Sequence, residues 1–260
     1  MAEQGCIVMD KVCYSVDGRT ILRDFDLRLE KGENRTILGV SGVGKTTILK
    51  LILGLLKPSS GAIYIDGIDI SGLSESRLAS VRKQIAIVFQ GGALFDSMTV
   101  GENVGYRLME EGELSEAEIE EIAREKLGFV GLEKAIDLYP AELSGGMKKR
   151  AAIARALAAD PEYIFFDEPT TGLDPIGVYN IQQLMLRLHG EGKTTLVVTH
   201  DMATAFAVSH RFSFIHDSRL VFEGSKAELE KSPIPAIREF FSPGEESLFS
   251  DVEAEGEDEA

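Results

Sequence analysis

The sequence predicts an α/β protein with a parallel sheet at its core and helices on both faces of that sheet. After Pro161, short and almost entirely apolar runs alternate with segments of helical pattern. Strands that are buried on both faces of a parallel sheet have this composition, and helices connect them. Two other segments have a different texture. Residues 7–40 alternate like half-buried strands, and residues 91–143 contain no strand-like run and are predicted to be mainly helical.

Turn signals divide the N-terminal part of the chain into short elements. The pairs Asp17-Gly18, Lys31-Gly32 and Asp66-Gly67 are typical of tight turns. Between such turns the expected strands are at 7–14, 22–29, 34–40, 62–65 and 85–89. The expected helices are at 46–53 and 75–82.

The second half of the chain is predicted from capping signals and apolar runs. Ser115 is followed three residues later by Glu118, which is a capping box, and the apolar Ile119 and Ile122 come next. The acidic stretch 110–125 is therefore expected to be the solvated face of a helix. The other expected helices are at 148–159, from near Pro175, from near Asp201 and at 235–241, and the expected strands are at 163–166, 195–199, 212–216 and 220–222.

Composition and charge restrict the class of protein. The chain has 260 residues, of which 44% are hydrophobic and 27% charged, as in ordinary globular domains. Residues 1–244 are expected to form a single domain with a helical subdomain at about 91–160. Residues 245–260 contain eight acidic residues and no basic one, and are predicted to be a disordered acidic tail. A net charge of −16 argues against nucleic acid as a partner, because phosphate backbones are bound mainly by Lys and Arg.

The chain is not expected to cross a membrane by itself. No run of about 18 uncharged apolar residues occurs. The N-terminal residues lack the basic start and the apolar core of a secretory signal, so a cytoplasmic location is expected.

A phosphate-binding loop is the most specific motif. The segment GVSGVGKT at 39–46 follows an apolar strand and opens a helix, which is the context that the motif G-x-x-x-x-G-K-[ST] requires. Its glycines allow backbone N–H groups to surround the phosphates of ATP, and the start of the helix adds a partial positive charge. Lys45 is expected to reach the β- and γ-phosphates, while Thr46 offers a hydroxyl to Mg²⁺. The nucleotide-binding residues of this segment are Gly39, Ser41, Gly42, Gly44, Lys45, Thr46 and Thr47.

Two carboxylates follow the apolar strand predicted at 163–166. Asp167 and Glu168 are expected at the carboxyl edge of the sheet, next to the phosphate loop. Asp167 is predicted to hold Mg²⁺ through water, and Glu168 to act as the general base on the attacking water. Read alone, the pair could also be two solvated acids at the end of a strand.

With a third element the chain resembles the ATPases of ATP-binding-cassette (ABC) systems. The sequence LSGGM at 143–147 comes shortly before Asp167, and five motifs of these ATPases occur in their usual order between residue 5 and about residue 225. The resemblance implies a P-loop NTPase (RecA-like) core with an antiparallel β-subdomain and an inserted helical subdomain. It also implies a homodimer in which Ser144, Gly145 and Gly146 of one copy close over the ATP of the other.

The resemblance also gives roles to residues whose chemistry alone would not. Gln90 matches the family's glutamine that contacts Mg²⁺ and the attacking water. His200 matches the histidine that contacts the γ-phosphate and orients Glu168. Asp174 matches an aspartate that communicates across the dimer. Asp174 followed by Pro175 could equally be a helix N-cap. Tyr14 is the candidate to stack on adenine, but Val16 could occupy that place instead, or Tyr14 could be a packed strand residue.

Two stretches point to one branch of the family. Residues 89–104 and 143–151 closely resemble the ATPases of MCE-type lipid transporters, which include the Mla (maintenance of lipid asymmetry) systems. Met147 stands where many cassettes have glutamine, and activity is expected to survive this change. The resemblance implies phospholipid transport through a separate integral-membrane permease and an MCE-domain protein. It also implies a peripheral position on the cytoplasmic face of the inner membrane.

Two other functions share the nucleotide motifs. One is the ATPase of an importer for small polar solutes, and the other is a non-transport cassette such as a scaffold for iron–sulfur assembly. DNA-repair cassettes are excluded by spacing, because Ser144 lies only 99 residues beyond Lys45 and leaves no room for their long coiled-coil insertion.

Overall fold

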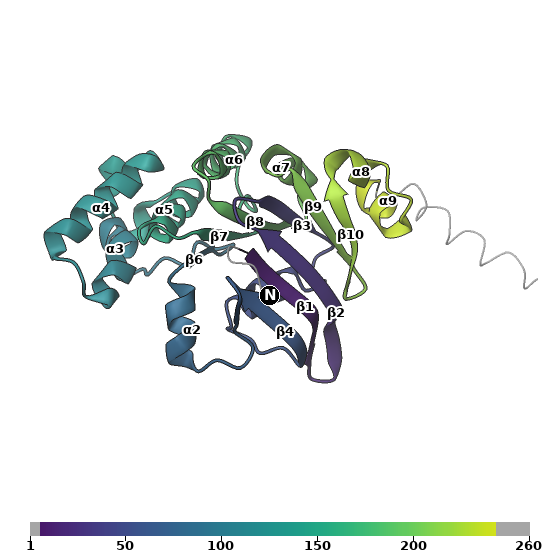
Figure 1. Cartoon of the computed structure of the whole chain (residues 1–260). Helices are drawn as coiled ribbons and strands as arrows, with labels where there is room; N and C mark the ends of the chain where they lie inside the picture. The colour runs from purple at the N-terminus through teal and green to yellow at the C-terminus, as the bar shows by residue number, and fades with distance from the viewer. Residues whose placement is uncertain (1–5, 243–260) are drawn as a thin grey trace, which may run out of the picture.

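A six-stranded sheet forms the core of the protein, as the sequence predicts. The computed structural model describes residues 6–242. The strand order is β10-β9-β3-β8-β7-β6 (Figure 1). Neighbouring strands are parallel except at one edge, where β10 runs antiparallel to β9. In sheet order the strands are β10 (Arg219–Ser225), β9 (Arg211–His216), β3 (Asn34–Leu38), β8 (Thr194–Thr199), β7 (Tyr163–Asp167) and β6 (Ile85–Val88).

The central strand β7 shows why these strands are so apolar. Its side chains alternate between two separate hydrophobic clusters, one on each face of the sheet. Tyr163 and Phe165 belong to the cluster that includes α1 (Lys45–Ile52), whereas Ile164 and Phe166 belong to the cluster on the opposite face. All four are fully buried. Both faces of the strand are therefore covered, which a parallel sheet requires.

The alternating N-terminal segment forms a second, antiparallel sheet with the order β2-β1-β4-β5. Its strands are β2 (Arg19–Glu30), β1 (Cys6–Val16), β4 (Ser60–Ile65) and β5 (Ile68–Asp69). Asp17 and Gly18 both have left-handed backbone conformations, with φ of 50° and 76°, and form the hairpin turn between β1 and β2. The predicted turn signal is therefore confirmed, because such turns require positive φ at both central residues.

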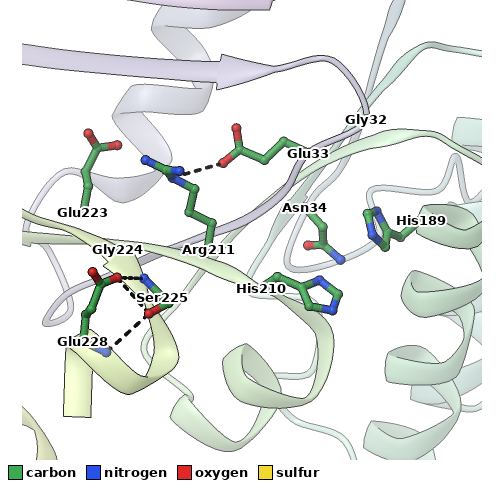
Figure 2. Close-up of a pocket in the computed structure, with 10 residues that line it drawn as sticks. All are labelled: Gly32, Glu33, Asn34, His189, His210, Arg211, Glu223, Gly224, Ser225 and Glu228. Atoms are coloured by element: carbon green, nitrogen blue, oxygen red, sulfur yellow. Dashed lines mark hydrogen bonds and ion pairs between the residues drawn. The ribbon is translucent and has the colours of Figure 1, made fainter. Parts of the chain in front are cut away.

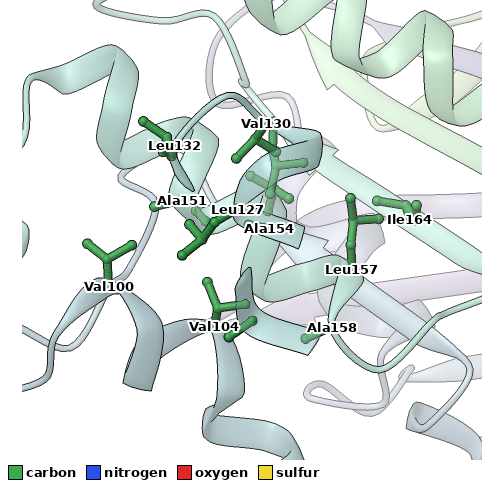
Figure 3. Close-up of a cluster of buried hydrophobic side chains, with 14 of the residues drawn as sticks. Val100, Val104, Leu127, Val130, Leu132, Ala151, Ala154, Leu157, Ala158 and Ile164 are labelled. Atoms are coloured by element: carbon green, nitrogen blue, oxygen red, sulfur yellow. The ribbon is translucent and has the colours of Figure 1, made fainter. Parts of the chain in front are cut away.

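The segment between β6 and β7 is helical, as predicted. It contains α3 (Val100–Glu111), α4 (Glu116–Phe129), the 3-10 turns Glu133–Ala135 and Pro140–Glu142, and α5 (Gly145–Leu157). Small and branched side chains from α3, α4 and α5 pack together in one cluster, which also contains Ile164 of β7 (Figure 3). Ser115 and Glu118 form the predicted capping box at the start of α4.

The start of α5 differs from the sequence-based prediction. The helix begins at Gly145, three residues before the predicted start, because the Ser144 side chain accepts a hydrogen bond from the backbone N–H of Met147. An N-cap serine satisfies an N–H group that has no partner within the helix. We call the LSGGM sequence at 143–147 the signature segment. Its two glycines are therefore already helical, and their poor helix propensity does not delay the start.

The remaining helices surround the sheet and complete the fold. They are α1 (Lys45–Ile52), α2 (Glu75–Arg82), α6 (Pro175–Gly190), α7 (Met202–Val208), α8 (Lys226–Glu230) and α9 (Pro235–Phe241). The sequence analysis missed α8, whose signal is the capping box of Ser225 and Glu228. No helix within residues 6–242 has the length and apolarity needed to cross a membrane. The acidic tail predicted at 245–260 lies outside the described residues.

Candidate nucleotide-binding and catalytic site

The glycine-rich loop connects the carboxyl end of β3 to the start of α1. A side chain at Gly39 would come within 2.8 Å of the Ile215 carbonyl oxygen, so the loop can lie this close to β9 only with glycine. Gly44 is the N-cap of α1 and has a φ of 109°, which side chains rarely allow. The loop therefore delivers its backbone and the start of α1 to the carboxyl edge of the sheet, as the phosphate-binding motif predicts.

Lys45 is buried beneath this loop. Its ammonium donates hydrogen bonds to the backbone oxygens of Gly39, at 2.8 Å, and Val40, at 3.2 Å. It also lies 3.6 Å from a carboxylate oxygen of Glu168. Burial lowers the pKa of Lys45, while the nearby Glu168 and Asp167 act in the opposite direction. The cation is thus held where it can contact an anion that enters the loop.

Asp167, the last residue of β7, contacts the first turn of α1. The Thr46 hydroxyl donates a hydrogen bond to Asp167 Oδ1 at 3.0 Å. Burial raises the pKa of Asp167, and the hydrogen bond from Thr46 partly opposes this shift. A buried carboxylate and a hydroxyl side by side are oxygen ligands of the kind that Mg²⁺ prefers.

Glu168 lies at the centre of a network of polar side chains. Its Oε1 is 2.9 Å from Nδ1 of His200, and its Oε2 accepts a hydrogen bond from the Thr199 hydroxyl at 3.0 Å. The Thr171 hydroxyl donates a longer bond, at 3.4 Å, to the same oxygen. The sequence analysis did not include Thr199 or Thr171, since a threonine near the end of a strand carries no specific signal. The carboxylate that was predicted to be catalytic is therefore firmly oriented.

A cavity of about 340 Å³ joins these residues. It is lined by Ser41, Gly42, Gly44, Lys45, Thr46, Thr47, Gln90, Glu168, His200 and Ile21. Nine of these ten residues were predicted from the sequence, and Ile21 of β2 was not. Tyr14, the predicted adenine contact, does not line this cavity and packs partly against the β-subdomain core. Stacking of adenine on Tyr14 stays a prediction.

The residues in and beside this cavity fit a magnesium ion only together with phosphate. Thr46 and Gln90 line the cavity and offer a hydroxyl and an amide oxygen, while Asp167 does not line it and offers a carboxylate that accepts the hydrogen bond from Thr46. Within residues 6–242 there is no group of three or more His, Cys, Asp and Glu side chains that could hold a metal ion alone. Mg²⁺ commonly combines one or two protein oxygens with phosphate oxygens and water, and this donor set suits that arrangement.

A larger cavity, of about 580 Å³, lies at the opposite end of the core strands (Figure 2). Its charged groups largely neutralise one another: Arg35 pairs with Glu33 and Glu223, and Arg211 lies 3.8 Å from Glu33. Glu228 is engaged in the capping box of α8. The phosphate-binding loop lies at the other end of these strands, where its residues line the smaller cavity.

The signature residues lie outside the nucleotide cavity of their own chain. Ser144 and Gly145 are exposed, and Gly146 is half-buried at the start of α5. The nearest atom to a side chain built at Gly145 belongs to Leu173, at 4.0 Å. Asp174, one residue further, accepts a hydrogen bond from the Gly177 N–H at 2.6 Å and caps α6. The structure thus shows the capping function of Asp174 and leaves its predicted role between two copies untested.

Comparisons with known proteins agree with this fold and site. A family model described as "ABC transporter" matches residues 22–171. The intermembrane phospholipid transport system ATP-binding protein MlaF of Escherichia coli K12 is 40% identical over 233 residues, which cover 89% of this chain and 87% of that protein. The probable ribonucleotide transport ATP-binding protein mkl of Mycobacterium tuberculosis H37Rv is 40% identical over 237 residues, or 91% of this chain and 66% of that protein.

A solved structure shows the same architecture. The ATP-binding cassette MJ0796, in a dimeric post-hydrolysis state bound to ADP and Pi, matches with a TM-score of 0.78 and 35% identity over 84% of this chain and 98% of that one. The chain therefore belongs to the ABC transporter family, and it is an ATPase of the ABC type.

Proposed function

We propose that this chain is the ATP-hydrolysing subunit of an ABC system that moves phospholipid through a separate membrane permease. The observation that carries the ATPase part is the Glu168 carboxylate, held between His200, Thr199 and Lys45 beside the phosphate loop. The phospholipid part rests on the extended similarity to a protein named for intermembrane phospholipid transport.

In this proposal the phosphate loop binds the triphosphate of ATP. Backbone N–H groups from Ser41 to Thr47 surround the phosphates, and the start of α1 adds its partial positive charge. Lys45 exchanges its bonds to the Gly39 and Val40 oxygens for the β- and γ-phosphates. The loop is shaped by glycine before ATP arrives, so little backbone rearrangement accompanies binding.

Glu168 acts as the general base in hydrolysis. Its carboxylate accepts a proton from the attacking water, while the Thr199 hydroxyl and His200 fix its direction. His200 is about half exposed and lines the cavity, so it can also contact the γ-phosphate. Gln90 also lines the cavity, so it can contact the same water through its side-chain amide.

Mg²⁺ is the metal that this donor set favours. Thr46, Asp167 and Gln90 would hold it together with phosphate oxygens, and it would neutralise charge that develops on the phosphates during transfer. Asp167 is most useful as an ionised ligand. Its raised pKa therefore favours metal binding near neutral pH over binding in acid.

The active form in this proposal is a homodimer. Ser144, Gly145 and Gly146 lie outside the cavity of their own chain, and they form a capped helix start that can bind a phosphate of the other copy. The two solved MJ0796 cassettes, 35% and 36% identical to this chain, are dimeric. Asp174 would then face the second copy from the start of α6.

The proposed partners are an integral-membrane permease and an MCE-domain lipid-binding protein. The chain would sit peripherally on the cytoplasmic face of the inner membrane, and no nucleic-acid partner is expected. The segment after Gln90 would receive the permease. We retain the division into one ATPase domain at 1–244, with a helical subdomain at about 91–160, as part of the proposal.

The experiment is a pull-down of this chain from detergent-solubilised native membranes, followed by identification of the proteins and extraction of the lipids. A polytopic permease, an MCE-domain protein and bound phospholipid are the expected result. Purely cytosolic partners, such as those of an iron–sulfur assembly scaffold, would overturn the transport part and leave the ATPase part standing.

A second candidate is the ATPase of an importer for a small polar solute. The mycobacterial relative is named for probable ribonucleotide transport, which favours this candidate. The same pull-down separates the two, because an importer of this kind would bring down a permease and a soluble solute-binding protein without phospholipid.

A further inference from the structure

Lys149, in the second turn of α5, is buried to an unusual degree for a lysine. Only 6% of it is exposed, the same fraction as for Lys45. Lysine is almost never fully buried unless its ammonium has a partner. Burial lowers the pKa of Lys149, while the nearby carboxylates of Glu168 and Asp167 act against that change. An ammonium kept in such a place calls for a specific contact.

The contact is made with the backbone of Glu168, the proposed general base. The Lys149 ammonium donates a hydrogen bond to the backbone carbonyl oxygen of Glu168 at 3.1 Å. Lys149 therefore holds the main chain of Glu168 from the side of α5, whereas His200 and Thr199 hold its side chain.

The backbone of Glu168 needs this support. Its φ is 47°, in the left-handed region that residues with a side chain rarely adopt. Such conformations persist when surrounding contacts fix them, and they concentrate at functional sites. The Glu168 N–H donates to the Val198 carbonyl of β8 at 2.9 Å, so β8 holds one side of the residue and Lys149 the other.

We propose that Lys149 is a positioning residue that keeps the Glu168 carboxylate aimed at the attacking water. This inference rests on the proposed role of Glu168 as general base. A rotation of the backbone after β7 would swing the carboxylate away from His200 and Thr199. Displacements of about 1 Å at a reacting group can cost about 100-fold in rate.

The same contact joins the two halves of the ATPase machinery within one chain. Lys149 lies four residues after Gly145, about one helical turn along α5. A movement of the signature segment is therefore carried by α5 to the backbone of Glu168. In the proposed dimer, Ser144 meets the nucleotide of the second copy and Glu168 acts on the nucleotide of its own chain. Helix α5 and Lys149 then connect these two residues mechanically.

The test compares ATP hydrolysis by the full-length chain and its variants, with ATP affinity and thermal unfolding measured on each. Lys149→Met keeps the length of the side chain and removes the ammonium. Lys149→Arg keeps a positively charged donor. Lys148→Met is the matched control, because Lys148 is the neighbouring lysine on α5 and is only half-buried.

In Lys149→Met we expect kcat to fall about 10- to 100-fold, with the KM for ATP changed less than about twofold. Lys149→Arg should recover most of the loss, and Lys148→Met should match the wild type. In a chain that already carries Glu168→Gln, Lys149→Met should add no further loss. If Lys149→Met does not fold, Lys149→Leu replaces it with the same expectations.

A kcat within about twofold of the wild type for Lys149→Met would overturn the inference. Equal losses in the Met and Arg variants would do so too, as would a full additional loss in the Glu168→Gln background. Normal turnover in Glu168→Gln alone would instead refute the proposed general base. The two failures are thus distinguishable.

Discussion

The phosphate-loop half and the signature half of this chain are built in opposite ways. Around the loop, the side chains of Lys45, Asp167 and Glu168 are buried or nearly so. Each already has a hydrogen-bond partner: the Gly39 carbonyl for Lys45, Thr46 for Asp167 and His200 for Glu168. In the signature half, Ser144 and Gly145 are exposed at the start of α5, and neither lines the nucleotide cavity of the chain. One half is already connected by hydrogen bonds, and the other is an exposed helix start, which in the proposed homodimer would meet the ATP of the second copy.

This contrast explains the different residue types in the two halves. In the proposed function the loop half binds several charged phosphate groups at short range, so it needs a rigid partner for each of them. In the proposed homodimer, the signature half has to approach and leave a nucleotide held by the other copy. Exposed small residues at a helix start can do this without losing buried contacts each time, and Lys149 connects that helix to the rigid half.

The largest expected effect comes from the organised half. Lys45→Ala should lower ATP turnover by about 100- to 1,000-fold, because it removes a buried cation aimed at the phosphates. Steady-state phosphate release by the full-length chain measures this. Lys50→Ala, on the exposed face of the same helix, is the matched control and should retain turnover. Equal turnover in Lys45→Ala and Lys50→Ala would show that the buried Lys45 ammonium has no special role in the loop half.

The second prediction concerns the half that needs a partner. Ser144→Arg should also abolish turnover, but an equal mixture with Lys45→Ala should recover about a quarter of wild-type activity. Random mixed dimers contain one site in which both halves are intact. The readout is phosphate release after the two chains are mixed and allowed to exchange.

A mixture of Lys45→Ala with Glu168→Gln is the control for this recovery. Both changes damage the same half, so every composite site of that mixture contains one defect. Recovery there, or none in the first mixture, would contradict a signature that acts between copies.

A smaller effect is expected on the stability of the organised half. The Tyr163 hydroxyl, buried at the start of β7, donates a hydrogen bond to Asp66 Oδ1 at 2.5 Å, and burial raises the pKa of Tyr163 so that it stays a neutral donor. Tyr163→Phe should lower the free energy of unfolding by about 1–3 kcal/mol, measured by urea denaturation. Tyr179→Phe, at an exposed tyrosine of α6, should leave it unchanged.

The smallest effect is expected in the helices that support the signature. Ser115→Ala removes the capping box of α4 and should cost about 1 kcal/mol of unfolding free energy. Ser74→Ala is an informative comparison, because Ser74 precedes α2 but makes no capping hydrogen bond. A loss at Ser74 as large as that at Ser115 would argue against capping as the cause.

Most of the fold was predictable because its signals are local. The predicted strands at 163–166, 195–199 and 212–216 are mostly apolar, and the pair Asp17-Gly18 is typical of a turn with positive φ, so the local sequence identifies them. The phosphate loop is equally local, and nine of the ten residues that line the cavity came from motifs.

The missed features depend on contacts between distant segments. Ile21 reaches the cavity only because the β1–β2 hairpin packs near Gly44, where a side chain would lie 3.0 Å from Ile21. Lys149 looks like one of several basic residues on a helix until its ammonium is seen against Glu168. The start of α5 was placed too late because glycines weaken a helix prediction, while the Ser144 cap outweighs them.

The alternation along β7 has a consequence for how this sequence can change over time. Odd positions 163 and 165 share their packing with α1 and the β-subdomain, and even positions 164 and 166 share theirs with α5 and α6. Among related sequences, substitutions at the odd positions should therefore covary with one set of partners and those at the even positions with another. Within this five-residue strand, the odd-numbered and the even-numbered positions would therefore show two independent patterns of covariation.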